Sequence, residues 1–449
     1  MFRRLMRTLP PVLVLALVAS CAGTDPSASG VFPAEGFLGR QMRVQISGDA
    51  TEWSASTKVN FGEGVTVDSV TLSSPTALFA NITIAANAPV GLRDVVITGG
   101  DNVTLKDAFE IESPISITFR GNAAQGSVGV LDIVNHDFET PFDTTSTGDG
   151  FLSPLVFTGL TAQAGNGVRI QFDSVSQYTA SATVLVDIDG VSGPLTLTSG
   201  PAGNTTPFPL GADFAIAPRS AVALTAGQAA MAAATKPYES FLYEFTPAMF
   251  PALARFQVSA SGEGNPRLAV MPASGKFADL LGASVDQRLA AKSGKFYIVL
   301  FDFSGEMDTY TTRVGSNLLT IVADTEPGNS TAAGAIQCNL PCLVENAQLA
   351  TRADEDWLKF TSGAMDAGRK LRVRTLAGDD FTDTRVDAFE GTSANPPSIG
   401  GPSGDSGYHE NFLFPTALKN STAYSVRIFA SPAWEDDTQT HYDALMYLE

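Results

Sequence analysis

Two short acidic segments near the end of the chain hold the oxygen atoms that a calcium ion prefers. Asp324, Glu326 and Asn329 lie in the first segment, and Asp354 and Asp356 lie in the second. Calcium binds about six to eight oxygen ligands from carboxylates and carbonyls. If the two segments meet at one corner of a domain, they form a cation site. The alternative is a solvated acidic turn in which Asn329 caps the backbone.

A possible catalytic serine occurs in the stretch 404–407, Gly-Asp-Ser-Gly. This stretch resembles the nucleophile motif of chymotrypsin-type serine proteases. A serine nucleophile needs a histidine base and an orienting acid. His136 lies in a different predicted domain, and His409 is too close to Ser406 in sequence to complete a triad easily. We therefore expect a glycine-rich loop and no enzymatic activity.

His136 is also followed by several acids, which is weak evidence for a metal site. These acids are Asp137, Glu139, Asp143 and Asp149. Because one histidine among scattered carboxylates lacks the spacing of a metal motif, a surface loop is the better interpretation.

The beginning of the sequence has the pattern of an export signal. Arg3, Arg4 and Arg7 precede a short apolar run over 10–18, and small residues lead to Cys21. This order is typical of secretory signals. The run is too short to span a bilayer, which takes roughly 20 apolar residues. An ordinary cleaved signal that is followed by cysteine by chance is the alternative.

Residues 18–21, Val-Ala-Ser-Cys, resemble the lipobox of bacterial lipoproteins. The resemblance implies that 1–20 is removed and that Cys21 carries lipid chains, which anchor the protein to a membrane. Ala22 stands where an inner-membrane retention signal of that family has aspartate, which implies the outer membrane. The small and polar residues of 21–30 predict a flexible tether.

Composition limits the partners of the chain. It has 449 residues, 17% of them charged, and a net charge of −19. This length suggests three or four domains. The negative charge opposes binding to nucleic acid and to anionic lipid headgroups, whereas it suits a soluble surface and cation binding.

Cys338 and Cys342 are the two cysteines besides Cys21. A zinc site needs about four ligands, and no histidine lies near them. In an exported protein such a pair favours a small-loop disulfide. Two free buried thiols are the alternative.

Hydrophobic residues alternate with polar ones along short runs between turn residues. Examples are Met42, Val44 and Ile46, and Leu371, Val373 and Thr375, the latter with Arg372 and Arg374 between them. Period two indicates strands with one buried face. The one helix-like window, 221–235, contains Gly227. We therefore predict an all-β chain of tandem antiparallel β-sandwiches, immunoglobulin-like ones followed by jelly-roll-like ones.

The segment 31–113 resembles the IPT/TIG-type immunoglobulin-like domain. The resemblance rests on Val59-Asn60-Phe61-Gly62, on the strand 89–98 and on Ala108-Phe109-Glu110-Ile111. These motifs are structural, since their glycines make turns and their apolar residues make a core. The segment 114–219 repeats several of these patterns, and we interpret it as a second, divergent immunoglobulin-like β-sandwich.

The segment 320–449 resembles the bacterial pre-peptidase C-terminal (PPC) domain, a small jelly-roll-like β-sandwich. The resemblance rests on 326–333, on 354–360 and on 424–428. Some relatives bind calcium at these two acidic places, which implies Glu326, Asn329, Asp354 and Asp356 as ligands, with Asp324 beside them. Gly328 departs from the family pattern. The segment 220–319 has matching motifs and is interpreted as a degenerate copy.

Together these features predict a lipid-anchored, non-enzymatic protein of a cell envelope that presents modules for a protein, polysaccharide or matrix ligand. An accessory or degenerate component of a secreted hydrolase or protease system is one alternative. A structural spacer is another.

Overall fold

The protein is an all-β chain, as the alternating pattern predicted. In the computed structural model the described residues are 25–136, 160–176, 179–199, 206–208, 213–325, 328–351, 353–377, 383–393, 395–402, 410–431 and 440–449. They form strands and two 3-10 turns, η3 (Phe277–Asp279) and η4 (Ala364–Asp366), without an α-helix. No helix in these ranges is long and apolar enough to cross a membrane.

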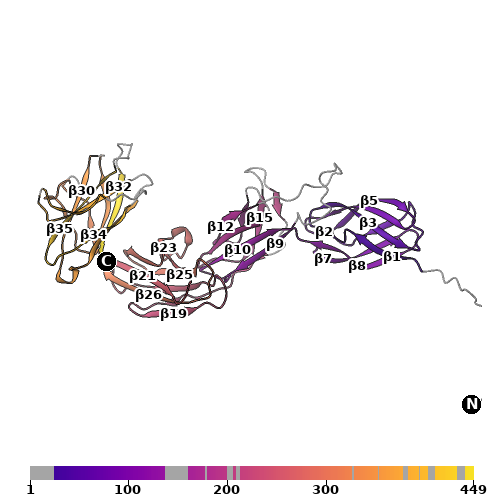
Figure 1. The fold of residues 1–449 in the computed structure, drawn as a ribbon, viewed down its shortest axis with the longest axis horizontal. Helices are drawn as coiled ribbons and strands as arrows, with labels where there is room; N and C mark the ends of the chain where they lie inside the picture. Colours follow the sequence, from indigo (N-terminus) through magenta and orange to yellow (C-terminus); the bar gives the residue numbers. More distant parts are fainter. Residues whose placement is uncertain are drawn as a thin grey trace, which may run out of the picture.

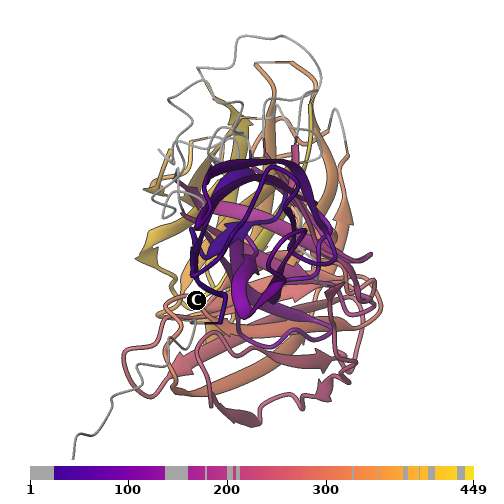
Figure 2. The same cartoon turned by 90° about the vertical axis from the view of Figure 1, so that its right-hand side faces the viewer.

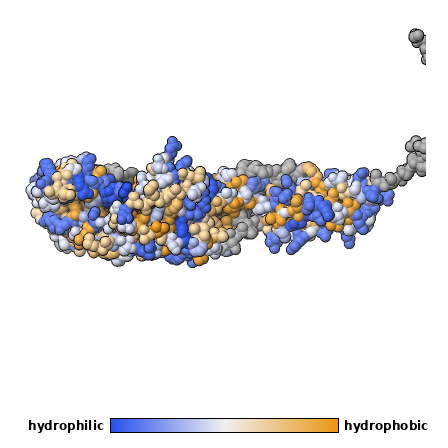
Figure 3. All heavy atoms as spheres, turned by 90° about the horizontal axis from the view of Figure 1, so that it is seen from below, coloured by the Kyte–Doolittle hydropathy of each residue, from blue (hydrophilic) through white to orange (hydrophobic). Residues whose placement is uncertain are grey.

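Four sandwich units follow one another along an elongated molecule (Figure 1). In the end-on view the first unit lies in front of the others (Figure 2). Hydrophilic and hydrophobic residues are interspersed along the face that is seen from below (Figure 3). We call residues 25–113, 114–219, 220–319 and 320–449 the first to fourth units.

The first unit packs two four-stranded sheets, β1-β3-β6-β5 and β2-β8-β7-β4. Met42, Val44 and Ile46 are buried on one face of β3. Phe61 and Phe109 pack edge to face in the core between the sheets. The strands are β1 (Ser27–Phe32), β2 (Glu35–Phe37), β3 (Gln41–Asp49), β4 (Lys58–Asn60), β5 (Val65–Ser74), β6 (Ala77–Ile84), β7 (Gly91–Thr98) and β8 (Val103–Glu112).

The second unit has a four-stranded sheet, β12-β13-β10-β9, opposite shorter strands. Its core centres on Leu131, Ile133 and Val184. The strands are β9 (Ile115–Arg120), β10 (Ser127–Asn135), β11 (Thr161–Gln163), β12 (Val168–Val175), β13 (Thr179–Val186), β14 (Gly193–Pro194), β15 (Thr196–Ser199), β16 (Thr206–Phe208) and β17 (Asp213–Phe214).

The third unit packs the sheet β18-β20-β25-β22-β23 on the sheet β19-β26-β21-β24. Phe245, Phe256 and Phe296 fill the space between them. The strands are β18 (Val222–Ala223), β19 (Ala229–Ala233), β20 (Phe241–Phe245), β21 (Ala252–Ala260), β22 (Pro266–Met271), β23 (Gly282–Ser284), β24 (Asp286–Ala291), β25 (Phe296–Asp302) and β26 (Thr309–Leu318).

The fourth unit packs the sheet β28-β30-β35-β32-β33 on the sheet β27-β29-β36-β31-β34. Leu371 and Val373 point into its core. The strands are β27 (Thr320–Ala323), β28 (Ile336–Gln337), β29 (Cys342–Leu349), β30 (Glu355–Thr361), β31 (Lys370–Ala377), β32 (Thr384–Glu390), β33 (Ser398–Gly400), β34 (Asn411–Ala417), β35 (Ala423–Ala430) and β36 (Thr440–Leu448). In both the third and the fourth unit, a short parallel strand begins a five-stranded sheet of otherwise matching order.

The junctions between the units differ in how much they bury. The cores of the first and second units stay separate across the link at 112–114. Residues of the second and third units share a core around Val128, Leu242 and Val299. There Arg219 donates to backbone oxygens of Gln125 and Ser240, and its burial lowers its pKa to about 10.

The third and fourth units share a second small core. Leu253 and Leu319 of the third unit pack on Leu343, Leu445 and Tyr447 of the fourth. Burial of each large apolar side chain contributes about 1.5–3 kcal/mol. The last two units are therefore docked, and the rim of this interface holds the candidate site.

Candidate functional site

A row of arginines borders the interface between the third and fourth units. On β31, Leu371 and Val373 face the core, so period two turns Arg372 and Arg374 to the opposite face. Tyr447 of the neighbouring strand β36 is paired with Arg372. This outer face of the fourth unit packs against the third, and its arginines are thereby placed at the interface instead of in open solvent.

The third unit contributes an arginine–carboxylate row from β21 and β24. Arg255 lies opposite Arg288 in the strand register, and Asp286 is two residues from Arg288 on the same face. Arg255 donates two hydrogen bonds to Asp286, one of 3.0 Å from Nε to Oδ1 and one of 2.5 Å from Nη2 to Oδ2. Burial alone would raise the pKa of Asp286, but the bonds and charge of Arg255 outweigh it and lower the pKa.

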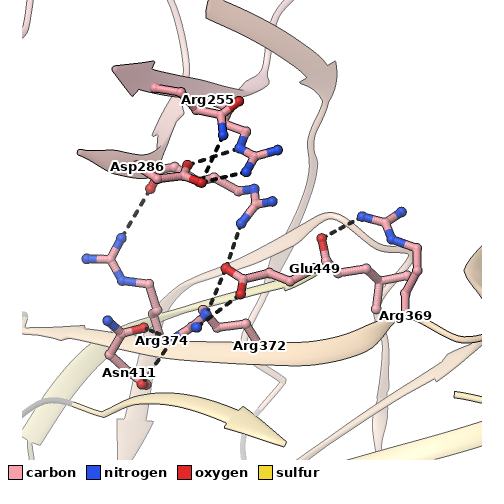
Figure 4. A network of polar contacts seen from close by, with 10 residues as sticks. Arg255, Asp286, Arg369, Arg372, Arg374, Asn411 and Glu449 are labelled. Atoms are coloured by element: carbon pink, nitrogen blue, oxygen red, sulfur yellow. Dashed lines mark hydrogen bonds and ion pairs between the residues drawn. The ribbon is translucent and has the colours of Figure 1, made fainter. Parts of the chain in front are cut away.

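Glu449 joins the two units through a carboxylate clamp (Figure 4). Arg288 of the third unit donates to its Oε1 at 2.7 Å. Arg372 of the fourth unit donates to Oε1 at 2.9 Å and to Oε2 at 3.0 Å. Burial opposes ionisation of Glu449, but Arg372 and then Arg288 overcome it, so the pKa of Glu449 lies below its ordinary value. Two units thus bind one carboxylate together.

Two further arginines border the clamp without a carboxylate partner among the described residues. Arg374 donates to the backbone oxygen of Arg288 at 3.1 Å, and Arg369 donates to that of Leu448 at 2.6 Å. A guanidinium carries five N–H donors in a planar fork. Since a carbonyl uses only part of this capacity, both side chains keep donors for an external anion.

Cavities lie on both sides of the clamp. One of about 480 Å³ is lined by Gln287, Arg288, Arg372, Arg374 and Asn411, among others. Another of about 490 Å³ is lined by Arg255, Arg288, Arg369 and Tyr447, among others. The guanidinium of Arg288, common to both, lies 4.7 Å from the ring centre of Tyr447. We call these cavities and the clamp between them the arginine groove.

The arginine groove is suited to hold an anion next to uncharged polar groups. Arginine forks match carboxylates bidentately, and charged hydrogen bonds are roughly twice as strong as neutral ones. Asn411 borders the same cavity, and its side-chain amide can donate hydrogen bonds to hydroxyls. The carboxylates of Asp286 and Glu449 in the same lining already accept hydrogen bonds from arginines.

Three of the residues predicted to bind calcium, Asp324, Asn329 and Asp356, lie together at one corner of the fourth unit. The Asn329 amide nitrogen donates to Asp324 Oδ1 at 2.8 Å and to Asp356 Oδ1 at 2.7 Å. Tyr442 donates to Asp356 Oδ2 at 2.5 Å. The second oxygen of Asp324 accepts from the backbone nitrogen of Gln348. Protein donors therefore occupy both oxygens of Asp324 and of Asp356.

Burial raises the pKa of two side chains in this network. Burial first, and then Asp356, raise the pKa of Tyr442 well above its ordinary value. Burial also raises the pKa of Asp324, although backbone donors partly oppose it. Asn329 is fully buried, and its Oδ1 has no hydrogen-bond partner among the described residues. A calcium ion would require this amide to turn over, so that its oxygen faced the carboxylates.

Calcium binding at this corner remains a prediction. Asp354 lies beside the network, where its oxygens accept from the backbone nitrogens of Ala350 and Glu355. Glu326 lies outside the described residues. Within the described ranges, no group of three or more His, Cys, Asp or Glu side chains is arranged to hold a metal ion.

The other predicted residues fall into two groups. The sulfurs of Cys338 and Cys342 are bonded, and both cysteines are buried in the core of the fourth unit. His136 Nε2 lies 2.8 Å from the hydroxyl of Ser116. Outside the described residues are Cys21, Ser406, His409, and the acids Asp137, Glu139, Asp143 and Asp149.

Sequence reasoning did not find the arginine groove. The alternation of Arg372 and Arg374 with core residues was visible, and it showed two arginines on one outer face. It did not show that the outer face of another sandwich covers this one. The approach of Arg288 and Arg372 to Glu449 depends on that docking and is not encoded in any local pattern.

No known protein family matches the sequence, and no curated protein matches it. Among solved structures, Aeromonas hydrophila PliG, a periplasmic lysozyme inhibitor of g-type lysozyme, is similar at 15% identity over 22% of this chain and 96% of its own, with a TM-score of 0.19. The Bacteroides ovatus SGBP-B, in complex with a mixed-linkage heptasaccharide, is similar at 11% identity over 65% and 75%, with a TM-score of 0.16. The I9–I11 tandem from titin is similar at 8% identity over 63% and 94%, with a TM-score of 0.18. Similarities this low carry nothing about what the chain binds.

Proposed function

We propose that this chain is a non-catalytic binding protein of a bacterial cell envelope, anchored by lipid on Cys21, and that its arginine groove binds a carboxylate-bearing polysaccharide. The observation that supports this most is the clamp on Glu449. In this clamp, arginines of two units donate hydrogen bonds to one carboxylate. The spare donors of Arg369 and Arg374 lie on either side of it.

The charge balance narrows the class of ligand. The whole chain has a net charge of −19, so it repels dense polyanions over most of its surface. The groove gathers five arginines, which are Arg255, Arg288, Arg369, Arg372 and Arg374. A polymer of mostly neutral sugars with occasional uronic acids meets the arginines locally and avoids long-range repulsion. The hydroxyls of such a polymer can accept hydrogen bonds from the side-chain amide of Asn411.

Calorimetric titration of the mature chain with neutral, uronate-containing and sulfated oligosaccharides tests the groove. We expect binding of the uronate-containing compounds. Arg374→Ala should weaken it about tenfold or more, because a charged hydrogen bond is worth about 1.5–3 kcal/mol. Arg43→Ala in the first unit, where Arg43 lies over Phe79, is the matched control.

Glu449→Gln should change the affinity for the ligand in the opposite direction. This variant frees Arg288 and Arg372 from their internal carboxylate, so we expect tighter binding of the uronate ligand. Binding that is indifferent to both Arg374→Ala and Glu449→Gln would reject the groove. Binding of acidic peptides alone would assign it to a protein partner instead.

The lipid anchor and the alternatives have their own tests. Cys21→Ser should release the chain from the membrane fraction.

Hydrolysis of a substrate that is lost in Ser406→Ala would support the accessory-hydrolase alternative and contradict a purely binding role. A chain that binds nothing in protein and polysaccharide panels would be a structural spacer.

A further inference from the structure

A second group of carboxylates lies in the third unit, in the loop between β25 and β26. This loop, 302–308, reads Asp-Phe-Ser-Gly-Glu-Met-Asp. Oxygen-bearing residues occupy every second position, at Asp302, Ser304, Glu306 and Asp308. The backbone oxygen of Glu306 accepts from the hydroxyl of Tyr310 at 2.7 Å, which ties the loop to β26.

Asp302 uses one of its oxygens to shape this loop. Its Oδ1 accepts from the backbone nitrogen of Ser304 at 2.8 Å, from the Ser304 hydroxyl at 2.6 Å and from the backbone nitrogen of Glu306 at 3.3 Å. The other oxygen, Oδ2, has no hydrogen-bond partner among the described residues, although Asp302 is only 1% exposed. A buried carboxylate oxygen without a partner is costly, because it has lost its hydration without replacement.

This oxygen lies beside the backbone of Gly264, close to a second carboxylate. A Cβ atom placed on Gly264 would lie 2.7 Å from Asp302 Oδ2 and 3.0 Å from Asp308 Oδ2. Asp308 is held there by the backbone nitrogens of Gly262 and Gly264, at 3.1 Å and 3.0 Å. Glycine at 264 therefore lets two carboxylate oxygens approach its backbone closely, where a Cβ atom would collide with them.

Within the described residues, no lysine or arginine forms an ion pair with Asp302 or Asp308. Two carboxylates that converge without a cation repel each other, and burial strengthens this repulsion. Oxygen donors of this kind, with carbonyl, hydroxyl and water oxygens to complete the shell, are those that calcium prefers.

We propose that Asp302 and Asp308 bind a calcium ion between their carboxylates, beside Gly264. The same loop carries the exposed residue Glu306 and the hydroxyl of Ser304, which donates to the other oxygen of Asp302. This site lies in a different unit from the acidic corner predicted from the sequence, and it does not depend on the groove. With two fixed carboxylates, its dissociation constant should be about 0.1–1 mM, the range of extracellular calcium modules.

Calorimetric titration of the metal-free mature chain with CaCl2 tests the proposal. Asp302→Asn keeps an oxygen for the loop amides but replaces Oδ2 by a nitrogen, so it should weaken binding at this site at least tenfold. Gly264→Ala would push a methyl group against both carboxylate oxygens without changing any charge, and it should have the same effect. Asp354→Asn, at the corner of the fourth unit, is the matched control and should leave this binding event intact.

Hydrogen exchange of the full chain localises the event without any variant. Calcium should slow exchange in the peptide that contains 302–308. Calcium binding that is lost in Asp354→Asn and kept in Asp302→Asn and Gly264→Ala would overturn the proposal. So would the absence of any calcium binding to the wild-type chain at 10-fold the expected dissociation constant, or unchanged exchange of the loop at saturation.

Discussion

The third and fourth units have matching strand orders, but their buried carboxylates differ in how many of their oxygens accept a hydrogen bond. In the fourth unit, Asp356 gives one oxygen to Asn329 and the other to Tyr442. In the third, Asp302 gives one oxygen to its own loop and leaves the other without a partner. Both side chains are about 1% exposed. Burial of a carboxylate alone therefore does not mark a ligand site, and the site proposed in the third unit depends on the missing partner of Asp302.

The strongest test of this difference replaces the buried aspartate by asparagine in each of the two units. Asp356→Asn places an amide nitrogen against the Asn329 amide or the Tyr442 hydroxyl, so a buried donor loses its acceptor. We expect a loss of about 2 kcal/mol in the stability of the fourth unit. Asp302→Asn removes a charge that has no partner, so without calcium we expect no loss, or a gain.

Denaturant dependence of hydrogen exchange in β30 and β25 measures the two effects separately in the full chain. Exchange is preferred to a single melting curve, because a chain of several domains does not unfold in one step. If Asp302→Asn in calcium-free buffer costs as much as Asp356→Asn, the distinction between the two carboxylates is wrong.

The disulfide is a further difference between the units, since the third has no cysteine. Joint replacement of Cys338 and Cys342 by serine should lower the stability of the fourth unit by about 2 kcal/mol, from the chain entropy of so short a loop. The third unit should be unchanged. Exchange in β29, with β21 as the internal reference, measures this, and an equal loss in both units would contradict it.

Acidification tests the contact between the two units. The pKa of Glu449 is lowered in the folded chain, so its ion pairs stabilise the docked state above its ordinary pKa of 4.5. This contribution is lost as the pH falls through the lowered value. For a carboxylate that is 29% exposed we expect about 1 kcal/mol. Glu449→Gln should flatten this part of the pH dependence of docking, and an unchanged slope would show that the clamp does not stabilise the interface.

The smallest effect is expected at Arg255. It pairs with Asp286 inside the third unit, and both side chains are about 40% exposed. Exposed pairs contribute about 0.2–1 kcal/mol, and salt screens them. Arg255→Ala should therefore change the stability of the third unit by about 0.5 kcal/mol in low salt and by less in 0.5 M NaCl. A loss above 2 kcal/mol would mean that this pair is part of the docking interface.

Sequence patterns were sufficient for features that depend on neighbouring residues. The alternation of Met42, Val44 and Ile46 with polar residues predicted which face of β3 is buried. The acidic corner was named from motif resemblance, and its residues Asp324, Asn329 and Asp356 do lie together. Its partner Tyr442 was not foreseen, because 86 residues separate it from Asp356.

Features that depend on docking or on loop shape could not be predicted. The arginine groove requires the outer faces of two sandwiches to meet, and nothing in the period-two pattern says which outer faces are covered. The loop at 302–308 showed acids in its sequence. That Asp302 Oδ2 points at Gly264 follows from the path of the chain through two loops, which local patterns do not determine.

The parallel pairing of β2 with β8 has a consequence for the first unit under tension. These strands lie near its two ends and pair in register from Glu35 with Glu110 to Phe37 with Glu112. A pull that separates the ends slides two parallel strands along each other, so their hydrogen bonds must yield together and not one after another. We therefore expect this pairing to help the first unit resist stretching, and single-molecule extension of the chain would measure that resistance.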